Sequence, residues 1–389
     1  MITDIGTNTI YFSEKLEEMF PETANRIFGS LKLLGIEPKL LDCTKDIWAR
    51  DYMPIQVSSD KFVEFRYDPD YLQGTDKGLR NLKTYPDMVC NKLGLKTEKS
   101  DLILDGGNVV KSSDCIILTD KVLKENRHIY TKPELISTLQ KTFEVDKVVL
   151  IPWDTLELYG HADGMVRFID NETVLVNKLY EKDTVLVNRL ESSGLKCKYL
   201  NYKVKKQNKN NWAYINFLQT KDIILLPKLG VDEDEQALKQ ISDFYPDYAD
   251  KNRIVQVEMN DIIALGGALN CISWTIKTQI MKIDLFRNKE ILEGENPYER
   301  KINSLEVYEY IKSHIEFNLE LNTWICIDKI FSEIWNSKIG LGGSFYWDEI
   351  EAEVLLEFKE HKILLPDNYV KTVVHLILEY IEQIGGILE

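Results

Sequence analysis

The sequence has few of the residues from which disulfide frameworks and metal centres are built. It holds six cysteines and five histidines in 389 residues, and no two cysteines form a CxxC pair. A Walker A loop, a GxGxxG stretch and an EF-hand loop are also missing. The sequence therefore indicates neither a disulfide scaffold nor a zinc site, and we expect a protein without metal or cofactor.

Long apolar runs and clusters of positive charge are missing as well. No window reaches the roughly 18 uncharged apolar residues of a membrane span, and the first residues do not form a basic segment followed by an apolar one. With 63 acidic and 48 basic residues the net charge is −15, which disfavours nucleic-acid binding and favours a cationic partner. We expect a cytoplasmic protein that binds neither a membrane nor a nucleic acid.

An apolar share of 44% is enough to build a full core in a chain of this length. Short runs of strand-forming residues recur at a spacing of roughly 40 to 60 residues, with helical patterns between them. The runs lie at 61–65, 114–118, 172–176, 222–226 and 261–265, and one interval holds a helical pattern at 233–245 and a strand at 253–257. This recurrence predicts a closed array of α/β modules around a central site, although a doubly wound α/β sheet would give similar local signals.

The alternation of strands and turns stops near residue 285. We expect an α/β domain over 1–285, a polar connector over 286–303 and an all-helical module over 304–389. In that module the apolar residues recur at helical spacing. They are Leu305, Tyr308, Ile311 and Ile315, then Trp347, Ile350, Val354, Leu355 and Phe358, and finally Val370, Val374, Ile377 and Ile381.

The choice of a catalytic base is narrow, because only His128 and His161 precede the helical module. His161 lies between two glycines in Tyr-Gly-His-Ala-Asp-Gly, and on an extended segment His161 and Asp163 would point to the same side. The pair could face one cavity. A loop histidine with an ordinary hydrogen bond would give the same pattern.

Three other segments carry reactive or charged side chains. Cys271 follows a loop of small residues at 265–270, Trp48 to Pro54 places aromatics beside charges, and Asp105 and Asn108 flank a Gly-Gly turn. Each could be a buried thiol or a structural turn and nothing more.

Together these side chains suit the chemistry of a guanidinium group. This planar cation is best held by carboxylates in its plane, a role that fits Asp51 and Asp163. Its central carbon requires a strong nucleophile, which a Cys271 thiolate would supply. His161 could protonate the leaving nitrogen and then activate water, with Asp105 orienting the imidazole.

At these residues the chain resembles the agmatine deiminase and bacterial-type peptidylarginine deiminase family, part of the guanidine-modifying (pentein-like) superfamily of five-bladed α/β propellers. The family's W-x-R-D-x-x-P, acidic-Gly-Gly-Asn, Gly-His-x-Asp and Gly-Gly-x-x-x-Cys stretches resemble 48–54, 105–108, 160–163 and 266–271. The resemblance implies a five-bladed propeller with an added C-terminal helical module. It also implies Cys271 as nucleophile, His161 as acid and base, and Asp51 and Asp163 as guanidinium ligands.

Substrate contacts beyond the guanidinium are less specific in the sequence. We take Trp48 and Asn108 as substrate-binding residues, and Trp153, Arg50 and Arg167 as further candidates for the far end of the substrate. Two features depart from the family. Asn270 stands where agmatine deiminases usually have a histidine before the nucleophile, and the helical tail has no counterpart in a minimal enzyme of the family.

The function expected from these residues is hydrolysis of a guanidino compound to a ureido compound and ammonia. The resemblance makes agmatine the leading substrate, with N-carbamoylputrescine as product and putrescine biosynthesis as the setting. Peptidyl or free arginine comes second, then an amidinotransferase, then a catalytically silent propeller that serves as a binding module. The tail could cap the site, bind a partner or form a homodimer.

Overall fold

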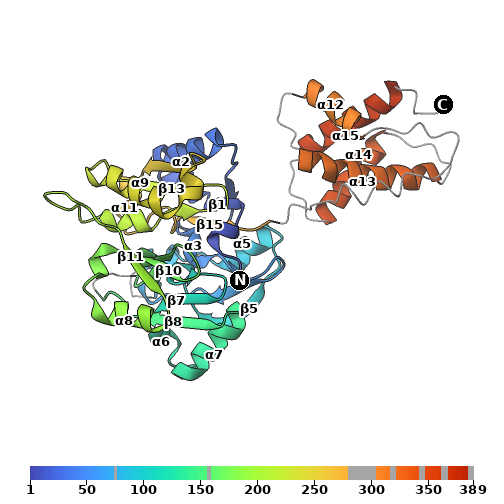
Figure 1. The fold of residues 1–389 in the computed structure, drawn as a ribbon. Helices are drawn as coiled ribbons and strands as arrows, with labels where there is room; N and C mark the ends of the chain where they lie inside the picture. The colour runs from blue at the N-terminus through green and yellow to red at the C-terminus, as the bar shows by residue number, and fades with distance from the viewer. Residues whose placement is uncertain are drawn as a thin grey trace. The chain divides into compact units, whose positions relative to one another are not determined.

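The computed structural model describes residues 1–73, 77–155, 159–278, 304–315, 321–340, 347–360 and 367–383 (Figure 1). The chain divides into two compact units, Met1–Thr278 and Gln279–Glu389. The expected connector at 286–303 lies outside the described residues.

The first unit contains five three-stranded sheets, and all five have the same plan. In each, the middle strand pairs antiparallel with one neighbour and parallel with the other. The orders are β15-β1-β2, β3-β4-β5, β6-β7-β8, β9-β10-β11 and β12-β13-β14. Because β15 pairs with β1, the end of the unit joins its beginning, with Ile276 opposite Thr9.

The strands are short, as expected of a unit assembled from small repeats. They are β1 (Thr9–Ser13), β2 (Lys39–Leu41), β3 (Ile55–Gln56), β4 (Phe62–Arg66), β5 (Glu98–Ile103), β6 (Val110–Lys111), β7 (Cys115–Thr119), β8 (Lys147–Ile151), β9 (Val166–Phe168), β10 (Thr173–Val176), β11 (Lys196–Tyr199), β12 (Leu218–Gln219), β13 (Ile224–Lys228), β14 (Ile254–Glu258) and β15 (Ser273–Ile276). The predicted strands at 61–65, 114–118, 172–176 and 222–226 overlap β4, β7, β10 and β13, which are the middle strands of their sheets.

The fifth predicted strand, at 261–265, is wrong. These residues begin in the helical turn α11 (Asn260–Ile263), and the strand of that repeat is β14. Ile262 and Ile263 are both buried, so the run is apolar without alternation. Such a short apolar run does not distinguish a strand from a buried helical turn.

Helices connect each middle strand to its parallel neighbour, because parallel strands require a crossover connection. In Figure 1 these helices lie on the outside of the first unit, with the strands inside. Helix α7 shows why they form: Leu135, Leu139 and Phe143 recur every four residues on its buried face, and Thr131 with Glu134 forms a capping box at its start. The crossover helices are α1 (Lys15–Met19), α2 (Pro21–Leu33), α4 (Lys77–Asn81), α5 (Pro86–Lys92), α6 (Lys121–Asn126), α7 (Lys132–Phe143), α8 (Thr184–Ser192), α9 (Glu233–Phe244) and α10 (Pro246–Ala249). Two further short helices, α3 (Ala49–Tyr52) and α11, lie between β2 and β3 and between β14 and β15.

The second unit is built from helices in its described part. These are α12 (Ser304–His314), α13 (Leu321–Gly340), α14 (Trp347–Glu360) and α15 (Asp367–Gln383). They share a buried core that includes Trp324, Phe331 and Phe358, and the expected apolar face of the last helix, from Val370 to Ile381, is buried in it. Among the described helices of the chain, none combines the length and apolar character that crossing a membrane requires.

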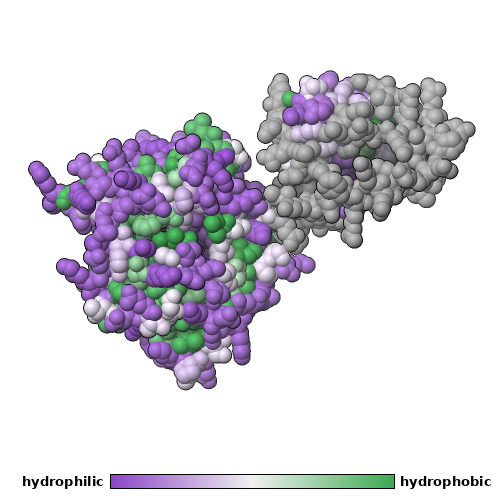
Figure 2. Space-filling model, viewed as in Figure 1, coloured by the Kyte–Doolittle hydropathy of each residue, from purple (hydrophilic) through white to green (hydrophobic). Residues whose placement is uncertain are grey.

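Hydrophilic residues dominate the face of the first unit that Figure 2 presents, and hydrophobic ones gather in separate patches.

Candidate active site

Five segments deliver side chains to one site, and each segment follows the third strand of a different sheet. After β2, helix α3 carries Asp51; after β5, a 3-10 turn (Gly106–Asn108) follows Asp105; after β8, another 3-10 turn (Ala162–Gly164) carries Asp163 next to His161. After β11 comes Asn216, and after β14 comes Cys271. The repeated strand plan therefore places one functional segment of every repeat at a common centre.

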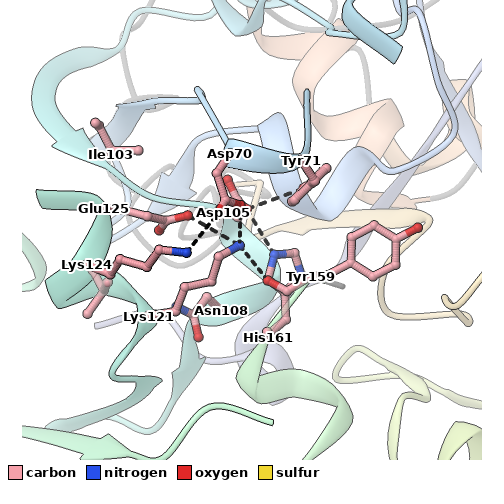
Figure 3. A network of polar contacts seen from close by, with 12 residues as sticks. Asp70, Tyr71, Ile103, Asp105, Asn108, Lys121, Lys124, Glu125, Tyr159 and His161 are labelled. Atoms are coloured by element: carbon pink, nitrogen blue, oxygen red, sulfur yellow. Dashed lines mark hydrogen bonds and ion pairs between the residues drawn. The ribbon is translucent and has the colours of Figure 1, made fainter. Parts of the chain in front are cut away.

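His161 is buried between two carboxylates. Its Nε2 lies 3.0 Å from Asp105 Oδ2, and its Nδ1 lies 3.5 Å from Asp51 Oδ1. Asp51 Oδ1 also accepts a hydrogen bond from Gly107 N at 3.1 Å. Figure 3 shows Asp105 joined to the imidazole from one side and to Tyr71 from another. The contact with Asp105 fixes the ring orientation, as expected of an orienting carboxylate.

Cys271 lies beside the third carboxylate of the site. Its Sγ is 3.6 Å from Asp163 Oδ2 and 3.2 Å from Asn216 Oδ1. The Cys271 backbone N–H donates to that same amide oxygen at 3.3 Å, so Asn216 holds both the backbone and the thiol of Cys271. Asn270, which stands in place of the family's usual histidine, donates to Asp163 Oδ2 at 2.7 Å.

Burial and these neighbours shift the proton affinities of the site. Burial and the carboxylates of Asp163 and Asp51 raise the pKa of Cys271 well above its usual range. Burial raises the pKa of Asp51 to about 8. Burial lowers the pKa of His161, but Asp51 and Asp105 outweigh this effect and raise it to about 10. At neutral pH the unliganded site therefore holds a thiol and an imidazolium.

Gly107 allows the close approach of the two halves of this site. A Cβ at that position would lie 2.5 Å from Asp51 Oδ1 and 2.7 Å from His161 Nδ1, too close for either atom. Gly107→Ala should therefore displace the reactive side chains and lower kcat/KM by about a hundredfold, the usual effect of a displacement near 1 Å. The rates are compared with those of Gly29→Ala in helix α2, away from the site, where a Cβ meets nothing within 4 Å. Equal activity of both variants would contradict the close approach.

A cavity of about 370 Å³ opens onto this site. Its described lining holds the carboxylates Asp46, Asp51, Asp154 and Asp163, and no lysine or arginine. Its aromatic side chains are those of Trp48, Tyr67, Tyr71, Tyr159, Tyr180 and Trp212. A cavity that is rich in carboxylates and aromatic rings suits a cation better than an anionic group.

The structure brings most of the predicted site residues together and places the others outside the cavity. Trp48 lines the cavity, whereas Asn108 does not: its buried side chain accepts a hydrogen bond from Thr119 N at 2.9 Å, which ties its turn to β7. The suggested distal contacts Arg50 and Arg167 form ion pairs with Asp4 instead, and neither they nor Trp153 line the cavity.

Asn216 and the two tyrosines nearest to His161, Tyr71 and Tyr159, were missed in the sequence. Tyrosines have no motif signal there. The repeats did give a signal for Asn216. Functional segments were recognised in four of five repeats, and Asn216 lies in the repeat that had none.

The fold and this set of side chains define a hydrolase that acts on carbon–nitrogen bonds. The sequence profile of the Porphyromonas-type peptidyl-arginine deiminase family matches residues 22–276, and the chain belongs to this family. This membership agrees with the family resemblance seen in the motifs.

Relatives and solved structures agree with that assignment. A "Putative agmatine deiminase" of Mycoplasma capricolum is 23% identical over 288 residues, which are 62% of this chain and 78% of the relative. Its namesake from Lactococcus lactis is 25% identical over 277 residues, 59% of this chain and 74% of the relative. The C. jejuni agmatine deiminase structure superposes with a TM-score of 0.56 at 17% identity, covering 72% of this chain and 95% of that one. The chain therefore shares the fold of that structure over most of its first unit.

Proposed function

We propose that this enzyme hydrolyses agmatine to N-carbamoylputrescine and ammonia through a covalent intermediate on Cys271. The observation that carries the proposal is the site itself: a thiol, an imidazole and two carboxylates meet in a cavity whose described lining contains no lysine or arginine. A guanidinium cation is the group that such a site would bind best.

Asp51 and Asp163 are the proposed ligands of the guanidinium. Both are buried and line the cavity, Asp51 on the side of His161 and Asp163 on the side of Cys271. A cation between them would neutralise the two carboxylates that raise the pKa of the Cys271 thiol. Substrate binding would thereby lower that pKa and release the thiol proton to solvent, so that the nucleophile becomes more reactive when substrate is present.

In the proposed reaction the Cys271 thiolate attacks the central carbon of the guanidinium and forms a C–S bond. The imidazolium of His161 gives its proton to one nitrogen, which leaves as ammonia and a thiouronium remains. The neutral imidazole then takes a proton from water, whose oxygen attacks the same carbon. As the C–S bond breaks, the hydroxyl of the tetrahedral adduct loses its remaining proton to solvent, where the released ammonia takes it up as ammonium. The thiolate and the imidazolium of His161 are restored and the ureido product leaves.

The composition of the cavity favours agmatine over free arginine. The α-carboxylate of free arginine would require a cationic partner far from the guanidinium, and the described lining offers no lysine or arginine for it. Agmatine ends in an amine instead, which suits the further carboxylates Asp46 and Asp154. Peptidyl arginine, which has no free α-carboxylate, is the second candidate.

The propeller is also part of the proposal. We take the five sheets of the first unit as the five blades of an α/β propeller, since they share one strand plan and the last strand joins the first sheet. The helical unit has no assigned part in the reaction.

The test is ammonia release and ureido product formation from agmatine, free arginine and an arginine peptide. We expect turnover of agmatine by the unaltered chain and none by Cys271→Ala, because no other described side chain replaces the thiol. Cys197→Ala, at a half-buried thiol in β11, is the matched control and should keep full activity. Turnover of the arginine peptide and not of agmatine would identify peptidyl arginine as the substrate. Transfer of the amidino group to an amine without ammonia release would favour the amidinotransferase, and no reaction at all would favour the silent module.

The pH dependence follows from two groups with opposite requirements. Asp51, with a pKa of about 8, must lose its proton to hold the cation, and His161, with a pKa of about 10, must keep its proton to release ammonia. The Cys271 thiol, whose pKa is raised, must also lose its proton and acts in the same direction as Asp51. We expect kcat/KM to rise by at least about tenfold per pH unit below pH 8, to pass through a maximum and to fall above pH 10. Initial rates measured from pH 6 to 11 check this, and an acid limb centred below pH 6 would contradict it.

A further inference from the structure

Lys121 is a buried cation close to the proposed active site that the reaction itself does not use. It begins helix α6, its side chain is 3% exposed, and it does not line the cavity. A buried lysine is costly unless it is paired, so its partners indicate what it does.

Apart from Glu125 on its own helix, its partners lie on two segments beside His161. The ammonium group donates to the Tyr159 backbone oxygen at 2.7 Å and lies 3.3 Å from Asp70 Oδ1. It also lies 3.3 Å from Glu125 Oε1 on its own helix and 5.1 Å from the centre of the Tyr71 ring (Figure 3). Lys121 thus links the segment of Asp70 and Tyr71 to the segment of Tyr159.

These two segments form one wall of the cavity. Tyr71 and Tyr159 both line it, and their rings meet edge to face with centroids 5.1 Å apart. The ring centres lie 6.4 and 6.1 Å from that of His161. The Tyr71 hydroxyl donates at 3.3 Å to the same Asp105 oxygen that contacts the imidazole. A change in the position of this wall would therefore reach both the cavity and the His161 pair.

We propose that Lys121 is a positioning residue of the active site, which holds Tyr71 and Tyr159 together as a fixed wall over His161. The stem of Lys121 supports this role, since a Cβ on Gly160 would lie 3.0 Å from its Cδ. The side chain packs against the residue before His161 and bonds to the residue before that. Lys121 acts through the two tyrosines and touches no reacting atom.

Lys124 provides a matched control. It pairs with the same carboxylate, Asp70, at 3.2 Å, but it is 49% exposed and its described contacts do not include Tyr71 or Tyr159. Lys121→Met retains the stem and removes the charge, and Lys124→Met makes the same change outside the wall. A difference in Cys271 reactivity or in kinetics between the two variants therefore reports on the link from Lys121 to the tyrosines.

The first experiment follows alkylation of individual cysteines by iodoacetamide with mass spectrometry, and needs no substrate. We expect Cys271 to be labelled at least about threefold faster in Lys121→Met than in the unaltered chain or in Lys124→Met, because a loosened wall admits the reagent. The buried Cys90 and Cys115 report on the fold and should keep their rates. An unchanged Cys271 rate would overturn the proposal, as would faster labelling of all three thiols, which marks a loss of fold. Asp70→Asn, which removes one end of the link, should show the same selective effect at smaller size.

The second experiment rests on the proposed function and uses agmatine kinetics. A positioned wall predicts that Lys121→Met raises KM by about tenfold with a smaller effect on kcat, whereas a merely structural role would lower the active fraction, and hence kcat, at constant KM. Failure of agmatine as a substrate would leave the alkylation result intact, so the two proposals fail separately.

Discussion

Replacing Asp163 by asparagine should nearly abolish turnover of agmatine and yet make Cys271 easier to alkylate. The first effect follows because the amide has the shape of the carboxylate and lacks its charge, so the buried guanidinium would lose one of its two anionic partners. Loss of one partner from a buried ion pair costs about 3–5 kcal/mol, which is roughly 10²- to 10⁴-fold in kcat/KM.

The second effect has the opposite sign because Asp163 acts on the thiol as well. Its Oδ2 lies 3.6 Å from Sγ, and its charge raises the pKa of Cys271. Without that charge the thiolate fraction at neutral pH increases, and iodoacetamide should react faster. Asp222→Asn, at an exposed carboxylate that pairs with Lys221, is the control for both measurements. Parallel loss of turnover and of alkylation in Asp163→Asn would mean a damaged fold and would contradict the assigned role.

His161→Gln should lower kcat by about 10²- to 10⁴-fold, the range expected when a general acid and base is removed. Glutamine can retain a hydrogen bond to Asp105 but cannot deliver or accept the proton. Asp105→Asn should cause a smaller loss, because the imidazole remains and loses only the partner that lies 3.0 Å from its Nε2.

The other histidine of the first unit supplies the control for this series. His128 is exposed, and His128→Gln should leave kcat unchanged. The measurement is steady-state ammonia release at saturating agmatine, together with circular dichroism to confirm the fold. If His161→Gln kept more than about a tenth of the activity, another group would have to deliver the proton.

Local sequence patterns determined the parts of this protein that depend on neighbours along the chain. Four of the five middle strands could be found because each is a short run of strand-forming residues bounded by polar ones. Glycine turns marked the loops that carry Asp105, His161 and Cys271, because tight turns and close approaches require glycine. The amphipathic spacing of the tail predicted helices, and its described residues form them.

Local patterns gave wrong predictions where one short sequence is compatible with two different structures. Ile262 and Ile263 could belong to a strand or to a buried helical turn, and the structure has the turn. Asn108 follows a Gly-Gly turn, where a substrate-binding residue could equally stand. In the structure its side chain instead accepts a hydrogen bond from Thr119 N in β7.

The sequence suggested which carboxylate serves which partner, but only the tertiary structure brings them within contact distance. Asp105 and His161 are 56 residues apart, and Asp163 and Cys271 are 108 apart, so no local pattern relates them. The choice of Asn216 as the partner of the thiol, the lack of lysine and arginine in the described cavity lining and the link through Lys121 likewise depend on closure of the sheets. The physical reason is that backbone preferences act over a few residues, whereas ion pairs, burial and pKa shifts depend on distances in space that the closed fold establishes.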